Sequence, residues 1–245
     1  MSESDSASAS ASASAGAGGR AGAVGGGRLR ALWRSAIGKK VVMSVTGLIG
    51  VAYVIGHMVG NLQVFQGAET INGYAAMLHG PLKSAVWCAR VVLLAAVVLH
   101  VVAAWQLTQL DRSARPVEYV RREPQISTLA SRTMRWGGVL LLVFIVFHIL
   151  HFTTGTLQPA PFVAGDVYGN MVGGFRIWWV ALFYVAAMVA LGFHLFHGAW
   201  SSARTLGLTR PSPRPLRRPV AALVAILVAA GFAIVPLAVF FGIVR

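Results

Sequence analysis

The chain has 245 residues, of which 56% are hydrophobic and only 11% are charged, and its mean hydropathy is +0.69. This balance excludes an ordinary soluble globular domain and predicts an integral membrane protein. The net charge of +14 would suggest nucleic-acid binding in a soluble protein, but the basic residues lie almost entirely between the apolar segments, so we expect no nucleic-acid partner.

The N-terminal residues 1–28 are an Ala/Ser repeat that passes into a Gly/Arg-rich segment without apolar periodicity. Such a segment cannot bury enough apolar surface to offset the entropy lost on ordering. It also lacks the apolar stretch of a signal peptide. We therefore expect a disordered tail over 1–28, followed by a membrane domain over 29–245.

Five mostly apolar segments follow, each of about 20 residues or more and therefore long enough to cross a hydrocarbon core of about 30 Å as a helix. They predict an all-α bundle of five transmembrane helices. The expected spans are 41–65, 84–109, 136–156, 177–200 and 219–243.

The lysines and arginines give these helices a direction. Of the 21, six lie in the chain up to Lys40, six in residues 110–135 and five in residues 201–218, all of which would share one side of the membrane. Because basic residues concentrate in cytoplasmic loops, we expect a cytoplasmic N-terminus and a C-terminus outside. The basic side is also a candidate docking face for a soluble partner.

Six of the seven histidines lie in the first four predicted spans, where a polar ring is costly and tends to mark function. At a rise of about 1.5 Å per residue, His57 and His148 reach similar depths toward the outside, and His100 and His194 reach similar depths toward the cytoplasm. Two imidazoles from facing helices at one depth can fill the two axial positions of a haem iron. The sequence predicts two such layers, roughly 10 Å apart.

Other interpretations of the histidines stay open. His151 and His197 each follow a candidate ligand by three residues on nearly the same helix face, so either member of each HxxH could be the ligand. The set could instead serve a divalent-metal transporter, since imidazole suits Zn, Cu or Ni, although the predicted spans contain no Asp or Glu. Each histidine taken singly could do no more than hydrogen-bond a neighbouring helix.

Glycines flank two of the candidate ligands, where they would either leave room for a bulky planar group or let helices pack closely. These glycines are Gly56, Gly60, Gly192 and Gly198. The single cysteine, Cys88, excludes a CxxCH attachment motif, so any haem would be held noncovalently.

Three segments carry a resemblance to a known family: SVTGLIGVAYVIGHMVGN around His57, RWGGVLLLVFIVFHILHF around His148 and FHLFHGAWS around His194. They resemble the cytochrome b membrane-anchor subunit of succinate dehydrogenase and fumarate reductase, in its single-chain, five-helix, two-haem form. The resemblance covers about residues 31–243. It implies one haem ligand from each of the first four helices, with helix one pairing with three and helix two with four.

The same resemblance selects between the neighbouring histidines. The match to HxxxG favours His194 over His197, and the matching position in the third span favours His148 over His151. The extra His151, His197 and Cys88 leave open a haem-free or iron–sulfur-containing variant, although a Rieske cluster normally takes two cysteines.

Further site residues follow less directly. The resemblance implies that Ser44 contacts propionates of the inner haem, with Trp136 and Arg204 as looser candidates. Arg90, near the outer end of the second span, would either neutralise a propionate or extend to the headgroups. Candidates for binding or protonating a quinone lie near the outer end, between helices one and two. For the histidine among them, the alternative interpretation is a hydrated loop residue. The candidates are His79, Glu69 and Gln63.

The resemblance also implies partners, namely a flavoprotein that carries the succinate site and an iron–sulfur protein that delivers electrons. The chain itself has no GxGxxG, P-loop or cysteine cluster, so the dicarboxylate chemistry must occur elsewhere. The expected function is to pass electrons through two b haems to a quinone, menaquinone being expected, in a bacterial cytoplasmic membrane. A higher oligomer is compatible with this assembly.

Overall fold

The computed structural model describes residues 30–113, 129–208 and 217–245, so the predicted tail over 1–28 lies outside the described residues. All regular secondary structure in the described part is helical, and five of its helices are long and apolar enough to cross a membrane. The prediction of an all-α bundle with five spans is confirmed. The spans are α2 (Ala36–Asn61) with the 3-10 turn η1 (Leu62–Gln66), α4 (Lys83–Ser113), α5 (Leu129–His148) with the π-helix η3 (Ile149–Thr153), α7 (Trp178–Thr205) and α8 (Arg217–Phe240).

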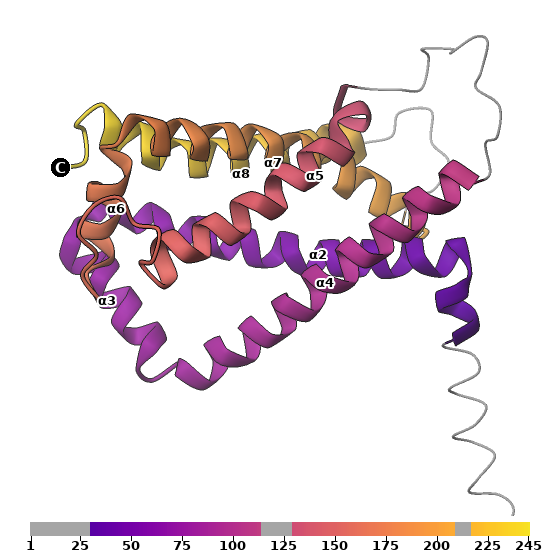
Figure 1. Ribbon diagram of the computed structural model, residues 1–245, viewed down its shortest axis with the longest axis horizontal. Helices are drawn as coiled ribbons and strands as arrows, with labels where there is room; N and C mark the ends of the chain where they lie inside the picture. The colour runs from indigo at the N-terminus through magenta and orange to yellow at the C-terminus, as the bar shows by residue number, and fades with distance from the viewer. Residues whose placement is uncertain (1–29, 114–128, 209–216) are drawn as a thin grey trace, which may run out of the picture.

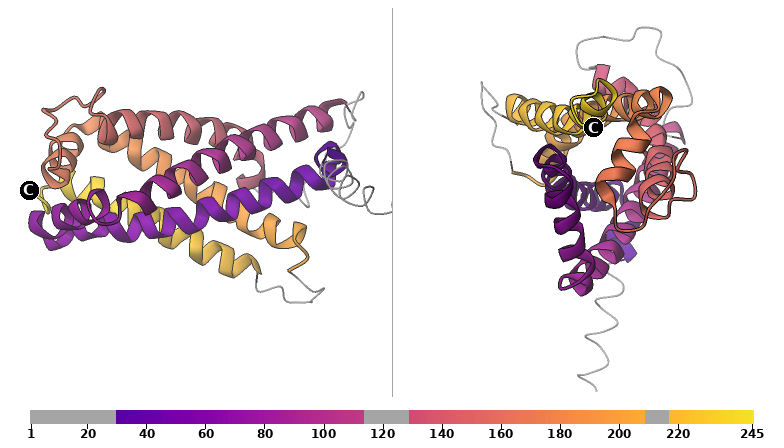
Figure 2. Two further views of the ribbon diagram at one scale, coloured as in Figure 1. Left: turned by 90° about the horizontal axis from the view of Figure 1, so that it is seen from below. Right: turned by 90° about the vertical axis from the view of Figure 1, so that its left-hand side faces the viewer.

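The packing of the spans defines an open-sided bundle. Helix α2 packs along α4 and α7, and α7 packs along α5, which places the four helices in the order α4, α2, α7, α5 (Figures 1 and 2). Helix α8 packs on both α7 and α2 and covers the groove between them. Within the described residues α4 and α5 do not pack closely on each other, so this side of the bundle stays open.

The helices alternate in direction, as the charge pattern requires. The starts of α2, α5 and α8 and the ends of α4 and α7 share one end of the bundle (Figure 1). Two short helices that the hydropathy pattern does not reveal, α3 (Ala68–His79) and α6 (Val167–Phe175), pack on each other at the opposite end.

The helix bounds differ from the predicted spans because hydropathy marks contact with lipid, whereas caps and hydrogen bonds determine where a helix ends. Helix α2 starts at Ala36 rather than residue 41, because the Ser35 side chain accepts a hydrogen bond from the Gly38 amide at 2.9 Å. The third span finishes at Thr153 instead of 156, after the helix has widened into the π-helix η3.

The outward faces of the spans are apolar, as expected for helices that contact lipid. On α4, for example, Val91, Leu94 and Trp105 are each about two thirds exposed. A buried cluster of apolar side chains instead joins α6, α7 and α8 near the end that carries α3, and it includes Phe175, Val180 and Tyr184. This cluster surrounds part of the site described next.

Candidate cofactor site

The four predicted ligand histidines form two pairs of neighbouring rings. The ring centres of His57 on α2 and His148 on α5 are 5.8 Å apart, and those of His100 on α4 and His194 on α7 are 6.0 Å apart. Both pairs join helices that lie diagonally across the bundle. Over the described residues, neither α2 and α5 nor α4 and α7 pack closely backbone to backbone, so the side chains span the space between them.

The spacing of the rings matches that of two imidazoles that share one metal ion. An imidazole nitrogen lies about 1 Å from the centre of its ring and about 2 Å from a bound metal, so imidazoles on opposite sides of one metal have ring centres about 6 Å apart. Two pairs with this spacing fit two metal centres that each take two axial nitrogens.

The two pairs lie at different levels of the bundle. Thr46, which contacts His100, precedes His57 by 11 residues on α2, and Tyr184, which contacts His148, precedes His194 by 10 residues on α7. Each interval corresponds to about 15 Å along a helix at 1.5 Å per residue. This length along the helices exceeds the roughly 10 Å of depth expected from sequence.

We call the pair formed by His100 and His194 the inner pair, because it lies nearer the start of α2 and so nearer the basic end of the bundle. Nδ1 of His100 lies 3.1 Å from the backbone carbonyl oxygen of Met43, which can only accept a hydrogen bond. Nδ1 must therefore carry the proton and donate it, which leaves the lone pair of Nε2 free for a ligand. Thr46 Oγ1 lies 3.3 Å from the same Nδ1, and Nδ1 of His194 is buried without a hydrogen-bond partner among the described residues.

The outer pair is the one formed by His57 and His148. The amide nitrogen of Asn61 donates to His57 Nε2 at 3.3 Å, so that this nitrogen carries a lone pair. The ring of Tyr53 stacks on His57, with the ring centres 5.4 Å apart and the planes only 10° apart. On the other side, Nδ1 of His148 lies 3.2 Å from the hydroxyl of Tyr184.

The two additional histidines occupy different surroundings. His151 lies in η3, is fully buried, and has Nδ1 2.9 Å from the Tyr184 hydroxyl. His197 is half-buried and contacts Trp200 one turn further along α7. In the described parts of the chain, no ring contact joins either residue to a histidine of another helix, so the geometry favours His148 and His194 as the paired members.

The propionate candidates are dispersed. Ser44 is buried on α2, whereas Trp136 on α5 is 80% exposed. The guanidinium of Arg204 lies 5.2 Å from the ring centre of Trp200, and that of Arg218 from α8 lies 4.8 Å from the same ring. These two arginines form a positive group at the end of the bundle nearer the inner pair.

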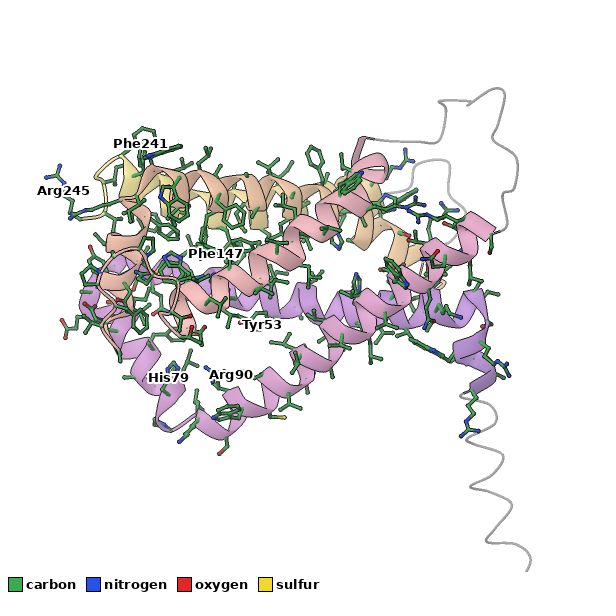
Figure 3. All side chains as sticks on the ribbon, in the orientation of Figure 1. Tyr53, His79, Arg90, Phe147, Phe241 and Arg245 are labelled. Carbon is green, nitrogen blue, oxygen red and sulfur yellow. The ribbon has the colours of Figure 1, made fainter. Side chains whose placement is uncertain are left out.

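At the end of the bundle that carries α3, Arg90 extends over the ring of Trp87 at 5.1 Å. Figure 3 shows Arg90 and His79 at the corner between α3 and α4. His79 is exposed and bonds to the carbonyl of Ala75, one turn earlier in α3, at 2.8 Å.

The other quinone candidates are Glu69, exposed in the first turn of α3, and Gln63, half-buried in η1. Glu69 precedes His79 by ten residues on α3, about 15 Å along the helix, so the three candidates are spread along η1 and α3, and no hydrogen bond joins them to one another within the described residues. Cys88 is exposed on α4 and, in the part of the chain that the structure describes, no three His, Cys, Asp or Glu residues gather as a metal cluster.

The flanking glycines differ in their surroundings, and one of them fits the close-packing role. A Cβ on Gly192 would lie 3.2 Å from Ala229 Cβ of α8, so this glycine allows close helix packing. A Cβ on Gly47 would instead lie 3.3 Å from Cε1 of His100, so this residue, not singled out from the sequence, makes room for a candidate ligand. Gly56 and Gly198 have no such neighbour within 4 Å, and a Cβ on Gly60 would contact Tyr74.

A small apolar cavity lies beside the inner pair, between α5 and α7. Its volume is about 200 Å³, and its lining includes Gly137, Phe193 and His194. The hollow is partly open at the surface of the bundle, because Val189 and Phe193 in its lining are exposed.

Sequence reasoning missed three residues that contact the candidate ligands: Thr46, Asn61 and Tyr184. Asn61 stands four residues after His57, a spacing that brings side chains together on a helix and could have indicated this contact. Tyr184 is separated from His148 by 36 residues and lies on another helix, so only the tertiary structure reveals it.

Comparison with known proteins gives one match. The family model of the succinate dehydrogenase/fumarate reductase transmembrane subunit matches residues 108–234, more than half of the chain. The match includes His148 and His194, one member of each pair, while His57 and His100 precede it. Searches of the curated proteins and of the solved structures find no match.

Proposed function

Because this chain belongs to the succinate dehydrogenase/fumarate reductase transmembrane subunit family, we propose that it is an electron-conducting membrane anchor. In this proposal it receives electrons from an iron–sulfur subunit, which is paired with a flavoprotein that oxidises succinate, and it delivers them to a membrane quinone. The observation that carries the proposal is the presence of two diagonal histidine pairs with ring centres 5.8 and 6.0 Å apart.

Two b haems are the groups that these pairs would hold. His57 and His148 would hold the outer one, and His100 and His194 the inner one. When bound, the two haems supply one-electron carriers at two depths of the membrane. The residues present fit such groups, because the ring spacing suits a shared iron and the Met43 carbonyl leaves Nε2 of His100 unprotonated.

Other residues would bind the haem propionates, the iron–sulfur subunit and the quinone. We propose that Arg204 and Ser44 stabilise propionates near the inner pair and that Arg90 does so near the outer pair. The basic end of the bundle, with most of the 21 lysines and arginines, would dock the iron–sulfur subunit on the cytoplasmic side. His79, Glu69 and Gln63 are the proposed contacts of the quinone near the outer end.

A quinone site near the outer end has an energetic consequence. Electrons that move outward go down a membrane potential that is negative inside, which contributes about 2.3 kcal/mol per charge per 100 mV for a full crossing. That contribution would assist reduction of a low-potential menaquinone. An uncoupler should then slow succinate oxidation in intact vesicles, and an unchanged rate would argue against outward transfer.

Alanine substitutions test the ligand assignment in the purified complex. His57→Ala or His148→Ala should remove one b haem and leave the other, whereas His100→Ala or His194→Ala should remove the other one. Reduced-minus-oxidised spectra and redox titrations distinguish the two. Loss of a haem from His151→Ala, with retention in His148→Ala, would overturn the assignment of His148.

A further inference from the structure

We propose that Tyr184 and His151 are positioning residues for His148, and that they form a buried hydrogen-bond chain behind it. The hydroxyl of Tyr184 lies 3.2 Å from Nδ1 of His148 and 2.9 Å from Nδ1 of His151. The inference rests on the proposed function, in which His148 binds the iron of the outer haem. It assigns the second histidine of the HxxH to support of the ligand instead of to coordination.

The number of protons fixes the direction of this chain. If Nε2 of His148 binds a metal, then Nδ1 carries the proton and donates it to the tyrosine oxygen. The tyrosine has one proton of its own, which it can then donate to Nδ1 of His151. His151 must consequently keep its ring proton on Nε2.

The far side of His151 fits that protonation state. Nε2 of His151 is buried without a hydrogen-bond partner among the described residues, and so is Oε1 of Gln158, whose amide nitrogen donates to the carbonyl of Asn170 at 3.0 Å. A Cβ on Gly174 would lie 2.9 Å from Nε2 of His151 and 3.5 Å from Nε2 of Gln158, so glycine is what lets the α6 backbone lie against both side chains. Nε2 of His151 can thus keep its proton without a described hydrogen-bond partner on this side.

The surroundings hold the chain in one arrangement. The ring of Tyr184 is packed edge-on against Phe144 and Phe175, with ring centres 5.0 and 4.9 Å apart. His151 lies in the π-helix η3, where the Thr154 amide bonds to the Ile149 carbonyl at 3.0 Å. Such π-helical turns are rare and occur frequently at functional sites.

A hydrogen bond from Nδ1–H to an acceptor makes the imidazole a stronger electron donor to its metal. Electron donation stabilises ferric over ferrous iron, so the tyrosine should lower the reduction potential of the outer haem. His151 should add to this effect, because the oxygen of a hydroxyl that donates its proton is a better acceptor.

The test is redox titration of the purified complex carrying Tyr184→Phe, which keeps the ring and removes the hydroxyl. The midpoint potential of one haem should rise by the equivalent of about a tenfold change in the ferric-to-ferrous ratio, or about 59 mV for one electron, while the other stays unchanged. Tyr168→Phe is the matched control: it removes a hydroxyl that donates to the Arg245 carbonyl at 2.9 Å and contacts neither histidine pair. It should leave both potentials in place.

Two variants of His151 distinguish its role as a hydrogen-bond acceptor for Tyr184 from a role in packing alone. His151→Asn offers an amide oxygen near the place of Nδ1 and should keep the potential close to that of the unaltered complex, whereas His151→Leu removes the acceptor and should raise it. Unchanged potentials in both Tyr184→Phe and His151→Leu, measured on the complex that retains haem, would overturn the inference. So would loss of the outer haem in His151→Asn, which would make His151 the ligand.

Failure of the proposed function would look different. A complex that shows no b-type absorption before any substitution would contradict the haem assignment and the inference built on it. A complex with two haems whose midpoint potentials do not change in the Tyr184 and His151 variants would contradict the inference alone.

Discussion

The backbone carbonyl of Met43 determines which nitrogen of His100 can bind a metal, because it accepts a hydrogen bond from Nδ1. Groups outside the ligand set, whether backbone or side chain, therefore determine which nitrogen each histidine offers to a metal. Nδ1 of His100 is hydrogen-bonded to a backbone carbonyl of the neighbouring helix α2, and Nδ1 of His148 to the Tyr184 hydroxyl of α7.

Gly47 provides a test at the scale of one residue. In Gly47→Val the first added carbon would lie 3.3 Å from His100, and the branched side chain would have to displace that ring. Overpacking of this kind costs about 1–3 kcal/mol, which corresponds to roughly 5- to 150-fold weaker retention of the inner haem. The haem content of the complex after dilution in detergent measures this retention.

The matched control is Gly50→Val, on the same helix, where an added Cβ meets nothing within 4 Å. It should retain both haems. Equal loss of haem in the two variants would show that valine disturbs the helix itself and not the space beside His100.

Individual residues also show what the sequence could and could not predict. Depth counted along the spans was sufficient to match His57 with His148 and His100 with His194, because side chains at similar depth in a bundle meet. It could not separate His148 from His151, since the π-helix and Tyr184 that distinguish them depend on tertiary contacts. The hydrogen-bond partners Thr46 and Tyr184 came only from the structure.

At the scale of elements, α3 and α6 are connected by hydrogen bonds at the end of the bundle. Asn72 of α3 donates to Oδ1 of Asp166 at 3.0 Å and accepts from the Tyr168 amide at 3.0 Å. Asp166 also accepts from the Gly169 amide and so caps α6. These donors, the Gly169 amide first and the Asn72 amide second, lower the pKa of Asp166.

The lowered pKa implies a pH dependence of this connection. A carboxylate whose pKa is lower in the folded state contributes stability above its unfolded value of about 3.9, and that stability is lost as pH falls through the folded pKa. Asp166→Ala should cost about 1 kcal/mol at neutral pH and speed hydrogen exchange of the α6 amides. Asp166→Asn keeps an accepting oxygen, so it should preserve protection at pH 7 and remove the acid-dependent loss. Equal exchange in all three proteins would contradict the role of this cap.

The five spans could be predicted from the sequence, whereas the two short helices and the start of α2 could not. The five spans followed from hydropathy because each has to cover the same thickness of lipid. The helices α3 and α6 were missed because 12 and 9 residues beside polar loops leave no comparable signal. The start of α2 was missed because Ser35, a polar residue outside the apolar stretch, caps it.

For the whole molecule, the two ends of the bundle differ in charge, which predicts the orientation in the membrane. In a Cys88→Ser background, Leu208→Cys would lie at the basic end and Phe241→Cys at the opposite end, and both native side chains are more than 70% exposed. A membrane-impermeant maleimide should label Phe241→Cys in intact cells and Leu208→Cys only after lysis. The reverse pattern would mean that the basic end faces outward.

Counting haem in the purified complex shows whether the two histidine pairs each hold one. We expect two b haems per copy of this chain by pyridine haemochrome assay, with two separate midpoint potentials, and one haem in either His57→Ala or His100→Ala. A complex that reduces quinone with no haem, or one that keeps both haems in these variants, would contradict this expectation.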